Sequence, residues 1–352
     1  MFVTGLAGSG NSTGINVAQR FCFEFCRAAS IMWEDNTFLF TAYTGSAAAA
    51  FGGLTTCTAT YLLKPKITDE HRDKFRGVRI IILDEVSFLK TSELNKLMEN
   101  LQDLGDTHSP FGGYNIVFGG DFQQLKPIRV KDNDILWHPS SGGDFERNLN
   151  CAIVLEGTHR FRDDQWYGNM LKRICTGQIT QEDIDKINTR VVGRNGLQLP
   201  KVIGGNTCYA CPYNDERNAI TAAIFAQHVR ETHPTKESND LPPEHTLMIE
   251  ADIKPLEESN EMGGFRSLRR RILELGDGDA RTDRHVLVDP CLRLYRGAYF
   301  MCNSNDKLEE NGTGNGTQCR LLSVKLKDNP TTYMWKTWDN YKVWTVHISD
   351  VE

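Results

Sequence analysis

Apolar and polar residues alternate along the first 150 residues in blocks that predict an α/β domain. Four short segments are mostly apolar, which is typical of parallel strands buried on both faces of a sheet. Longer segments between them repeat apolar residues at roughly 3.6-residue spacing, which predicts amphipathic helices. Strands that alternate with helices in this way predict a mainly parallel sheet. The apolar runs are residues 2–4, 37–42, 78–83 and 114–118, and the clearest helical segments are residues 12–29 and 94–104.

Residues 151–352 predict a second domain of more irregular pattern. A strand-like run, AIVLEG, opens it, and Thr180 is placed to cap one of the helices that follow. A polar stretch at residues 229–285 is expected to be a surface insertion, because proline, glycine and charged residues interrupt every periodic pattern there. From residue 292 short strands with glycine turns predict a small β element. The expected helices cover residues 165–176, 181–191 and 215–228.

Composition narrows the function only slightly. The chain has 352 residues, of which 39% are hydrophobic and 24% charged, and this is ordinary for a globular protein. Its net charge of −6 gives no general attraction to nucleic acid, so any such binding requires a local basic surface. No apolar stretch reaches the length of a membrane span, and we expect an intracellular protein.

The ten cysteines are irregularly spaced, and we expect them to be reduced thiols. Cys22 and Cys26 fall beside Phe21 and Phe25 on one face of the first predicted helix, which indicates packing rather than metal binding. A lone CxxC at residues 208–211 has no second pair of ligands nearby, whereas structural zinc requires four.

The segment GLAGSGNS at residues 5–12 joins the first predicted strand to the first helix. It follows the phosphate-loop pattern G-x-x-x-x-G-K-[ST], in which backbone N–H groups surround phosphates and a lysine reaches the β and γ phosphates. Gly5, Gly10 and Ser12 occupy the pattern's positions, but Asn11 stands at the lysine position. Glycine also serves any tight connection between a strand and a helix, so the loop alone is weak support for nucleotide binding.

Carboxylates follow the third apolar run directly. Asp84 and Glu85 are expected at the carboxyl edge of the sheet, where the glycine loop should also lie. In a phosphate-loop ATPase the first would hold Mg²⁺ and the second would orient the attacking water. The alternative is a solvated strand end. Past the next strand, Gln124 could sense a γ phosphate, although a simple turn at residues 119–121 is the better explanation of this stretch taken by itself.

Together these segments resemble the PIF-like group of superfamily 1B DNA helicases, and the resemblance covers nearly the whole chain. The similar segments are GLAGSGNS (motif I), TAYTGSAAAAFGGLTTCTA at residues 41–59 (motif Ia), IIILDEVSF at 80–88 (motif II), GGDFQQLKP at 119–127 (motif III), LEGTHR at 155–160 (motif IV), residues 169–190, residues 294–305 and residues 315–317.

The resemblance implies roles for individual residues. Asp84 and Glu85 would be the metal and water carboxylates, Gln124 the phosphate sensor and Arg160 an arginine finger reaching the γ phosphate. Ser12 would join Asp84 at Mg²⁺. The implied ATP-binding residues are Gly5, Ala7, Gly8, Ser9, Gly10, Asn11, Ser12 and Thr13.

For DNA, the resemblance implies contacts from Thr44, Gly45, Phe51 and Thr55. Phe51 would stack on a base, although packing in the core is an equally good explanation of an aromatic beside an alanine run. An arginine cluster at residues 266–271 is better explained as a solvated helix face than as a contact to the DNA backbone.

The implied protein is an ATP- and Mg²⁺-dependent helicase that unwinds duplex DNA while tracking a single strand 5′ to 3′. Its expected fold is a RecA-like ATP-binding domain at residues 1–150 and an incomplete RecA-like domain with a small β insertion at residues 151–352. Single-stranded DNA or DNA junctions are the expected partners. Roles in DNA repair, recombination and telomere maintenance would place it in the nucleus or a mitochondrion of a eukaryote, or otherwise in the cytoplasm.

The chain departs from the family pattern in ways that predict weak catalysis. Asn11 carries no positive charge, and Cys57 occupies a place where the family has histidine. We expect a truncated helicase, because neither the family's upstream adenine-binding segment nor its last two motifs is present. An inactive remnant that binds nucleotide or nucleic acid is therefore an alternative. An unrelated phosphate-loop ATPase or kinase is a second one, which the order of GGDFQQLKP and LEGTHR disfavours.

Overall fold

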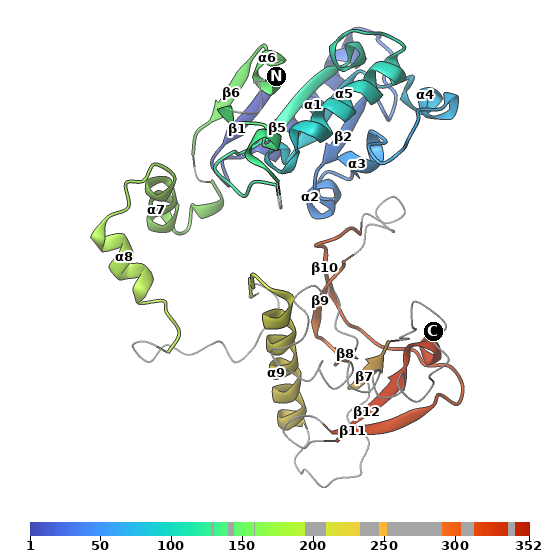
Figure 1. Ribbon diagram of the computed structural model, residues 1–352, viewed down its shortest axis with the longest axis vertical. Coiled ribbons are helices and arrows are strands. Elements are labelled where there is room, and N and C mark those ends of the chain that lie inside the picture. Colours follow the sequence, from blue (N-terminus) through green and yellow to red (C-terminus); the bar gives the residue numbers. More distant parts are fainter. Residues whose placement is uncertain are drawn as a thin grey trace. The chain divides into compact units, whose positions relative to one another are not determined.

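A parallel sheet of six strands forms the centre of the N-terminal part of the chain (Figure 1). The computed structural model describes residues 1–127, 130–139, 144–157, 159–193, 209–232, 246–251, 291–303, 313–336 and 342–352. The spatial order of the strands is β3-β2-β4-β5-β1-β6, and each neighbouring pair is parallel. This sheet confirms the predicted α/β fold. The strands are β1 (Phe2–Gly5), β2 (Phe38–Ala42), β3 (Leu54–Thr55), β4 (Ile80–Asp84), β5 (Asn115–Gly120) and β6 (Ala152–Leu155).

Helices pack on both faces of this sheet. On one face Leu97 and Leu101 of α5 pack in a cluster with Ile81 and Phe118, and on the other Ile15 of α1 packs with Phe40. Burial on both faces explains why the strands are continuously apolar in sequence. The helices of this region are α1 (Asn11–Ala28), α2 (Gly45–Ala50), α3 (Thr56–Ala59), α4 (Asp69–Phe75), α5 (Thr91–Gly105), α6 (Asp144–Arg147), α7 (Gln165–Cys175) and α8 (Gln181–Asn188). Short 3₁₀ turns are η1 (Val86–Phe88), η2 (Pro110–Gly113), η3 (Asp132–Asp134), η5 (His159–Phe161) and η6 (Ile348–Asp350).

The packing face of α1 differs from the expected one. Ile15 is buried and Cys22 packs beside it, but the side chains of Phe21 and Phe25 stack on each other and are 69% and 57% exposed. Phe21 and Phe25, which share the predicted apolar stripe with the two cysteines, therefore lie away from the sheet. A wide apolar stripe on a helix cannot by itself show which of its edges faces the sheet.

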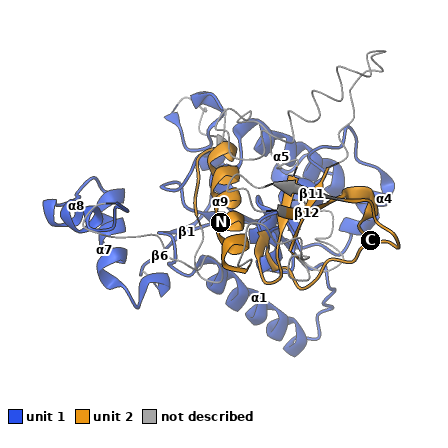
Figure 2. Cartoon of the chain, turned by 90° about the horizontal axis from the view of Figure 1, so that it is seen from below, with its two compact units in different colours: residues 1–198, 301–317 blue, residues 199–300, 318–352 orange. Residues whose placement is uncertain are grey.

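The chain divides into two compact units, which Figure 2 colours blue and orange. The first contains residues 1–198 and 301–317, and the second contains residues 199–300 and 318–352. The expected division after residue 150 differs from this one, because β6 pairs in register with β1 from Phe2↔Ala152 to Gly5↔Leu155. The strand that was expected to open the second domain is thus the edge strand of the first sheet.

The second unit is built around a four-stranded mixed sheet of order β11-β12-β7-β8. Phe225 and Val229 of its helix pack with Met248 and Cys291 of the sheet. β7 lies within the stretch expected to be irregular, while the arginine cluster at 266–271 lies outside the described residues. Among the described residues, none of the helices is both long and apolar enough to cross a membrane. The elements are α9 (Asn214–Thr232), β7 (Leu247–Glu250), β8 (Cys291–Leu294), β11 (Thr332–Lys336) and β12 (Lys342–His347), and β9 (Tyr299–Met301) pairs with β10 (Gln318–Arg320) in a separate ribbon.

An ion pair joins α7 to α8. Arg173 donates from Nε to Oδ2 of Asp183 at 2.7 Å and from Nη2 to Oδ1 at 2.5 Å, and the Asp183 side chain is 1% exposed. Thr180 caps α8 as expected, since its Oγ1 accepts the Asp183 backbone N–H at 3.2 Å. The hydrogen bonds from Arg173 hold the pKa of the Asp183 carboxyl well below its usual range. The folded protein therefore favours the charged form of this carboxylate.

We expect Asp183→Asn to loosen α7 and α8 without unfolding the sheet. Because the pKa is lowered by folding, the charged carboxylate contributes stability above the unfolded pKa of about 4 and loses it as the pH falls below that value. Amide hydrogen exchange at pH 7 should become faster in α7 and α8, and the difference from the unmodified chain should shrink toward pH 3. The control is Asp185→Asn, on the exposed side of α8; equal exchange in both variants would contradict the prediction.

Candidate nucleotide and DNA site

The loop between β1 and α1 has the backbone of an anion-binding turn. Gly8 and Gly10 have φ of +85° and +101°, and the Ser9 N–H donates to the Leu6 carbonyl at 2.9 Å. Gly10 precedes α1 and no side chain caps the helix. The first N–H groups of α1 are thus left for a ligand or water, and the helix dipole favours an anion there. Ser12 and Thr13 are exposed on this first turn.

Asn11 begins α1 and hydrogen-bonds within the loop. The Ser9 hydroxyl donates to Asn11 Oδ1 at 3.2 Å, which ties the two side chains together across Gly10. An amide can hydrogen-bond to a phosphate but brings no charge, so the loop keeps its backbone geometry and lacks the cation of its pattern. Ala7 and Gly5 complete the loop, and a Cβ at Gly5 would lie 2.6 Å from the Leu155 carbonyl oxygen.

Two acidic residues lie at the end of β4. The Asp84 side chain is buried, and its Oδ1 accepts the Glu85 backbone N–H at 3.0 Å. A Cβ at Gly119 would be only 2.6 Å from that oxygen, so the glycine of the neighbouring strand makes room for the carboxylate. Glu85 has a left-handed backbone, with φ +58°, which turns the chain sharply out of the strand. Burial raises the pKa of Asp84, and burial and then the charge of Asp84 raise the pKa of Glu85.

Asp121 is the residue of this site that sequence reasoning missed as a functional group. It is 5% exposed, accepts the Gln123 backbone N–H at 2.9 Å, and accepts the Gln124 side-chain Nε2–H at 3.1 Å. Its charge also contributes to the raised pKa of Glu85. Asp121 therefore positions Gln124 and lies near the motif II carboxylates. The sequence did offer a signal for Asp121, because it directly follows a buried strand, as the predicted functional residue Asp84 does.

Arg160 lies against the glycine loop. Its backbone N–H donates to the Gly8 carbonyl at 3.3 Å, and a Cβ on Gly8 would lie 2.4 Å from the Arg160 Cβ. The positive charge of Arg160 partly offsets the rise in the pKa of Glu85, so the two side chains are close enough to interact. The structure thus brings together the loop, both motif II carboxylates, Gln124 through Asp121, and Arg160.

Of the candidate DNA residues, Thr44 and Gly45 follow the end of β2, and Thr55 is the last residue of β3. Phe51 lies between them, at the end of α2. Thr44 caps α2 by accepting the Ala47 N–H at 3.4 Å, and Gly45 follows it, buried. Thr55 is buried and caps α3, and its hydroxyl also pairs with the Thr58 hydroxyl at 2.9 Å, so it has less hydrogen-bonding capacity left than Thr44. The ring of Phe51 stacks on Phe40 at 5.7 Å and joins the core on the α1 face, which favours the packing explanation over base stacking.

Oxygen ligands suitable for Mg²⁺ are present beside the loop. The Asp84 carboxylate and the Ser12 hydroxyl are hard oxygen donors of the kind that Mg²⁺ prefers beside bound phosphates, so these residues fit that ion. Within the described part of the chain, no group of three or more His, Cys, Asp or Glu side chains could hold a metal by itself. Cys208 of the CxxC lies outside the described residues.

Comparison with known proteins finds similarity to PIF1-like helicases. Residues 1–136 match the family described as PIF1-like helicase. The chain is 26% identical over 193 residues to the ATP-dependent DNA helicase PIF1 of Saccharomyces cerevisiae, which covers 52% of the chain and 22% of that protein. It is 29% identical over 223 residues to the ATP-dependent DNA helicase Pif1 of a Psychrobacter species, covering 59% of the chain and 31% of that protein.

A solved structure shares the fold. The Pif1 helicase from Bacteroides in complex with ADP-AlF3 and single-stranded DNA aligns with a TM-score of 0.55 and 19% identity, covering 97% of this chain and 69% of that one. At this identity the alignment supports the RecA-like fold alone. The aligned regions span less than a third of the length of the two curated helicases.

We expect Glu85→Gln to stabilise the protein. Because the folded state raises the pKa of Glu85, its charge is unfavourable at neutral pH, and this cost disappears as the pH falls below the unfolded pKa of about 4.3. The unfolding temperature should rise at pH 7, and the gain should vanish near pH 4. Exposed Glu99→Gln is the control, and a lower unfolding temperature for Glu85→Gln at pH 7 would contradict the argument.

Proposed function

We propose that this chain, whose residues 1–136 match the family of PIF1-like helicases, binds ATP at its glycine loop and single-stranded DNA beside Thr44. It would act as the nucleotide-binding part of a helicase that tracks one strand 5′ to 3′, with ATP turnover lowered by Asn11. The observation that carries the proposal is the gathering of Asp84, Glu85 and Arg160 around the glycine loop.

In the proposed reaction the loop N–H groups hold the phosphates of ATP. Mg²⁺, held by Asp84 and Ser12, would neutralise charge on the β and γ phosphates. Glu85 orients the attacking water and receives its proton, for which a raised pKa is suited. Arg160 stabilises charge on the γ phosphate, and such arginines contribute roughly 10³ to 10⁵ in rate. Gln124, held by Asp121, contacts the γ phosphate.

The proposed DNA contacts come from the α2 and α3 region. Thr44 and the backbone N–H groups that follow it lie at the end of β2, where they can donate to phosphates. The chemistry of these groups suits the DNA backbone rather than a particular base. The Bacteroides relative was solved with single-stranded DNA, which supports this class of partner.

A protein that binds without turnover is the second candidate, and the Ser9–Asn11 hydrogen bond favours it. The neutral side chain of Asn11 cannot stabilise the negative charge that develops on the phosphate oxygens during phosphoryl transfer. Such a protein would retain nucleotide and DNA binding. It would hydrolyse ATP no faster than its Glu85→Gln variant.

We expect Asn11→Lys to tighten ATP binding by about tenfold or more, the effect of one charge-assisted hydrogen bond. DNA-stimulated ATP hydrolysis should rise above the low rate of the unmodified chain, because the lysine also stabilises charge in the transition state. Calorimetric titration with Mg·ATP and a phosphate-release assay with single-stranded DNA provide the measurements.

Glu85→Gln, alone and with Asn11→Lys, is the control for that experiment. It should abolish DNA-stimulated hydrolysis and leave nucleotide binding intact. Hydrolysis that survives Glu85→Gln would overturn the assignment of the water carboxylate. Turnover in the unmodified chain equal to that of Glu85→Gln would select the second candidate.

We expect Thr44→Val to weaken binding of a labelled oligo-dT roughly two- to tenfold, the range of one hydrogen bond. Fluorescence anisotropy at fixed salt measures the affinity. Thr107→Val, at the opposite edge of the sheet, should leave it unchanged. Equal affinities for both variants would remove Thr44 from the DNA surface.

A further inference from the structure

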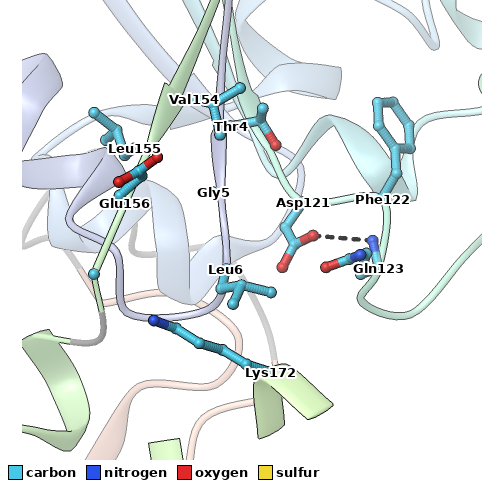
Figure 3. Close-up of a pocket in the computed structure, with 11 residues that line it drawn as sticks. Thr4, Gly5, Leu6, Asp121, Phe122, Gln123, Val154, Leu155, Glu156 and Lys172 are labelled. Carbon is cyan, nitrogen blue, oxygen red and sulfur yellow. Dashed lines mark hydrogen bonds between the residues drawn. The ribbon is translucent and has the colours of Figure 1, made fainter. Parts of the chain in front are cut away.

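A cavity of about 390 Å³ opens beside the glycine loop (Figure 3). Three chain segments that end at the same edge of the sheet form its walls: the end of β1 with Leu6, the turn after β5, and the end of β6. Each of these segments also carries or adjoins a residue of the proposed nucleotide site. One further side chain, from α7, completes the lining. The segments are residues 4–6, 121–123 and 154–157, and the side chain is Lys172.

Lys172 is the one cationic residue among those that line this cavity. Figure 3 shows its side chain extending from α7 so that its amino group lies beside the loop just past Leu6. The ammonium has no ion pair or hydrogen bond within the described residues. Two other cationic side chains of α7 and α8 interact with groups outside the cavity. Arg173 forms an ion pair with Asp183, and Lys186 lies 4.0 Å from the centroid of the Trp166 ring.

The Arg173–Asp183 pair sets which face of α7 carries Lys172. Arg173 is the next residue on α7, and its guanidinium is held by a buried carboxylate of α8. Adjacent helix residues point about 100° apart, so a fixed Arg173 leaves Lys172 on a different side of α7. With Arg173 held by Asp183, Lys172 lies on the face of α7 that lines the cavity beside the loop.

We propose that Lys172 supplies the phosphate-binding cation that Asn11 does not. The ligand is a nucleoside di- or triphosphate, and the proposal rests on the nucleotide site proposed above. A lysine ammonium is a compact charge on a flexible four-carbon stem, so it can move from the cavity onto a phosphate held by the loop. Asn11 keeps its hydrogen bond to Ser9, and the cation arrives from α7.

The test is a cycle of four versions of the 352-residue chain: unmodified, Lys172→Gln, Asn11→Lys and the double variant. The probe is Mg·ADP, and calorimetric titration measures its affinity. Lys172→Gln should weaken ADP binding at least about tenfold in the unmodified chain. It should change the affinity less than about twofold in the Asn11→Lys chain, where the loop has its own cation.

Two further variants control for folding and for net charge. Lys172→Arg, which keeps the charge, should retain most of the affinity. Lys186→Gln removes a charge from α8 and should change ADP binding less than about twofold in either background.

Failure of the lysine proposal is distinguishable from failure of the nucleotide site. If the unmodified chain and Lys172→Gln bind ADP equally, or if the loss is the same in both backgrounds, Lys172 does not replace the missing lysine. Binding that needs Asn11→Lys also overturns the proposal. If no variant binds ADP, the proposed nucleotide function itself is overturned.

Discussion

The candidate site depends on a close backbone contact between Gly8 and Arg160. The loop turns at Gly8 with a positive φ, and a side chain there would collide with the Cβ of Arg160. The contact exists because β6 pairs beside β1, so the chain leaving β6 passes directly over the loop that leaves β1. The pairing of β6 with β1 and the absence of a side chain at Gly8 therefore place Arg160 near Glu85, although Arg160 is about 150 residues from Gly8 in the sequence.

The same edge concentrates negative charge that the fold only partly compensates. Asp84 and Asp121 are buried, and the negative charges of both raise the pKa of Glu85. The positive charge of Arg160 lowers that pKa but does not cancel the rise. Buried carboxylates without matching cations cost stability and persist where function requires them. A bound cation would relieve this repulsion, so the apo site is predisposed toward a metal ion and a ligand that brings it.

The sheet could be predicted from sequence because its strands are buried on both faces and hence continuously apolar, as in the run ending at Asp84. The edge strand β6 was assigned to the wrong unit because a strand's neighbours are not encoded in its own apolar pattern. Helix periodicity predicted the stripe that contains Phe21 and Phe25, but it could not show that these two rings lie away from the sheet. Asp121 was overlooked because its partners, Gln123 and Gln124, become visible only when the turn is folded.

Lys172 shows that a sequence motif cannot identify every cation that lies near a binding loop. A motif assigns a charge to a position in the chain, but a phosphate responds only to a charge at a position in space. Any cation that replaces the loop lysine must come from an element that reaches this same sheet edge. The ends of β5 and β6 present the acidic residues Asp121 and Glu156 there, whereas α7 presents a lysine. Loss of the lysine at residue 11 therefore does not by itself remove positive charge from the site, and the helix that supplies the charge is held by its own buried ion pair.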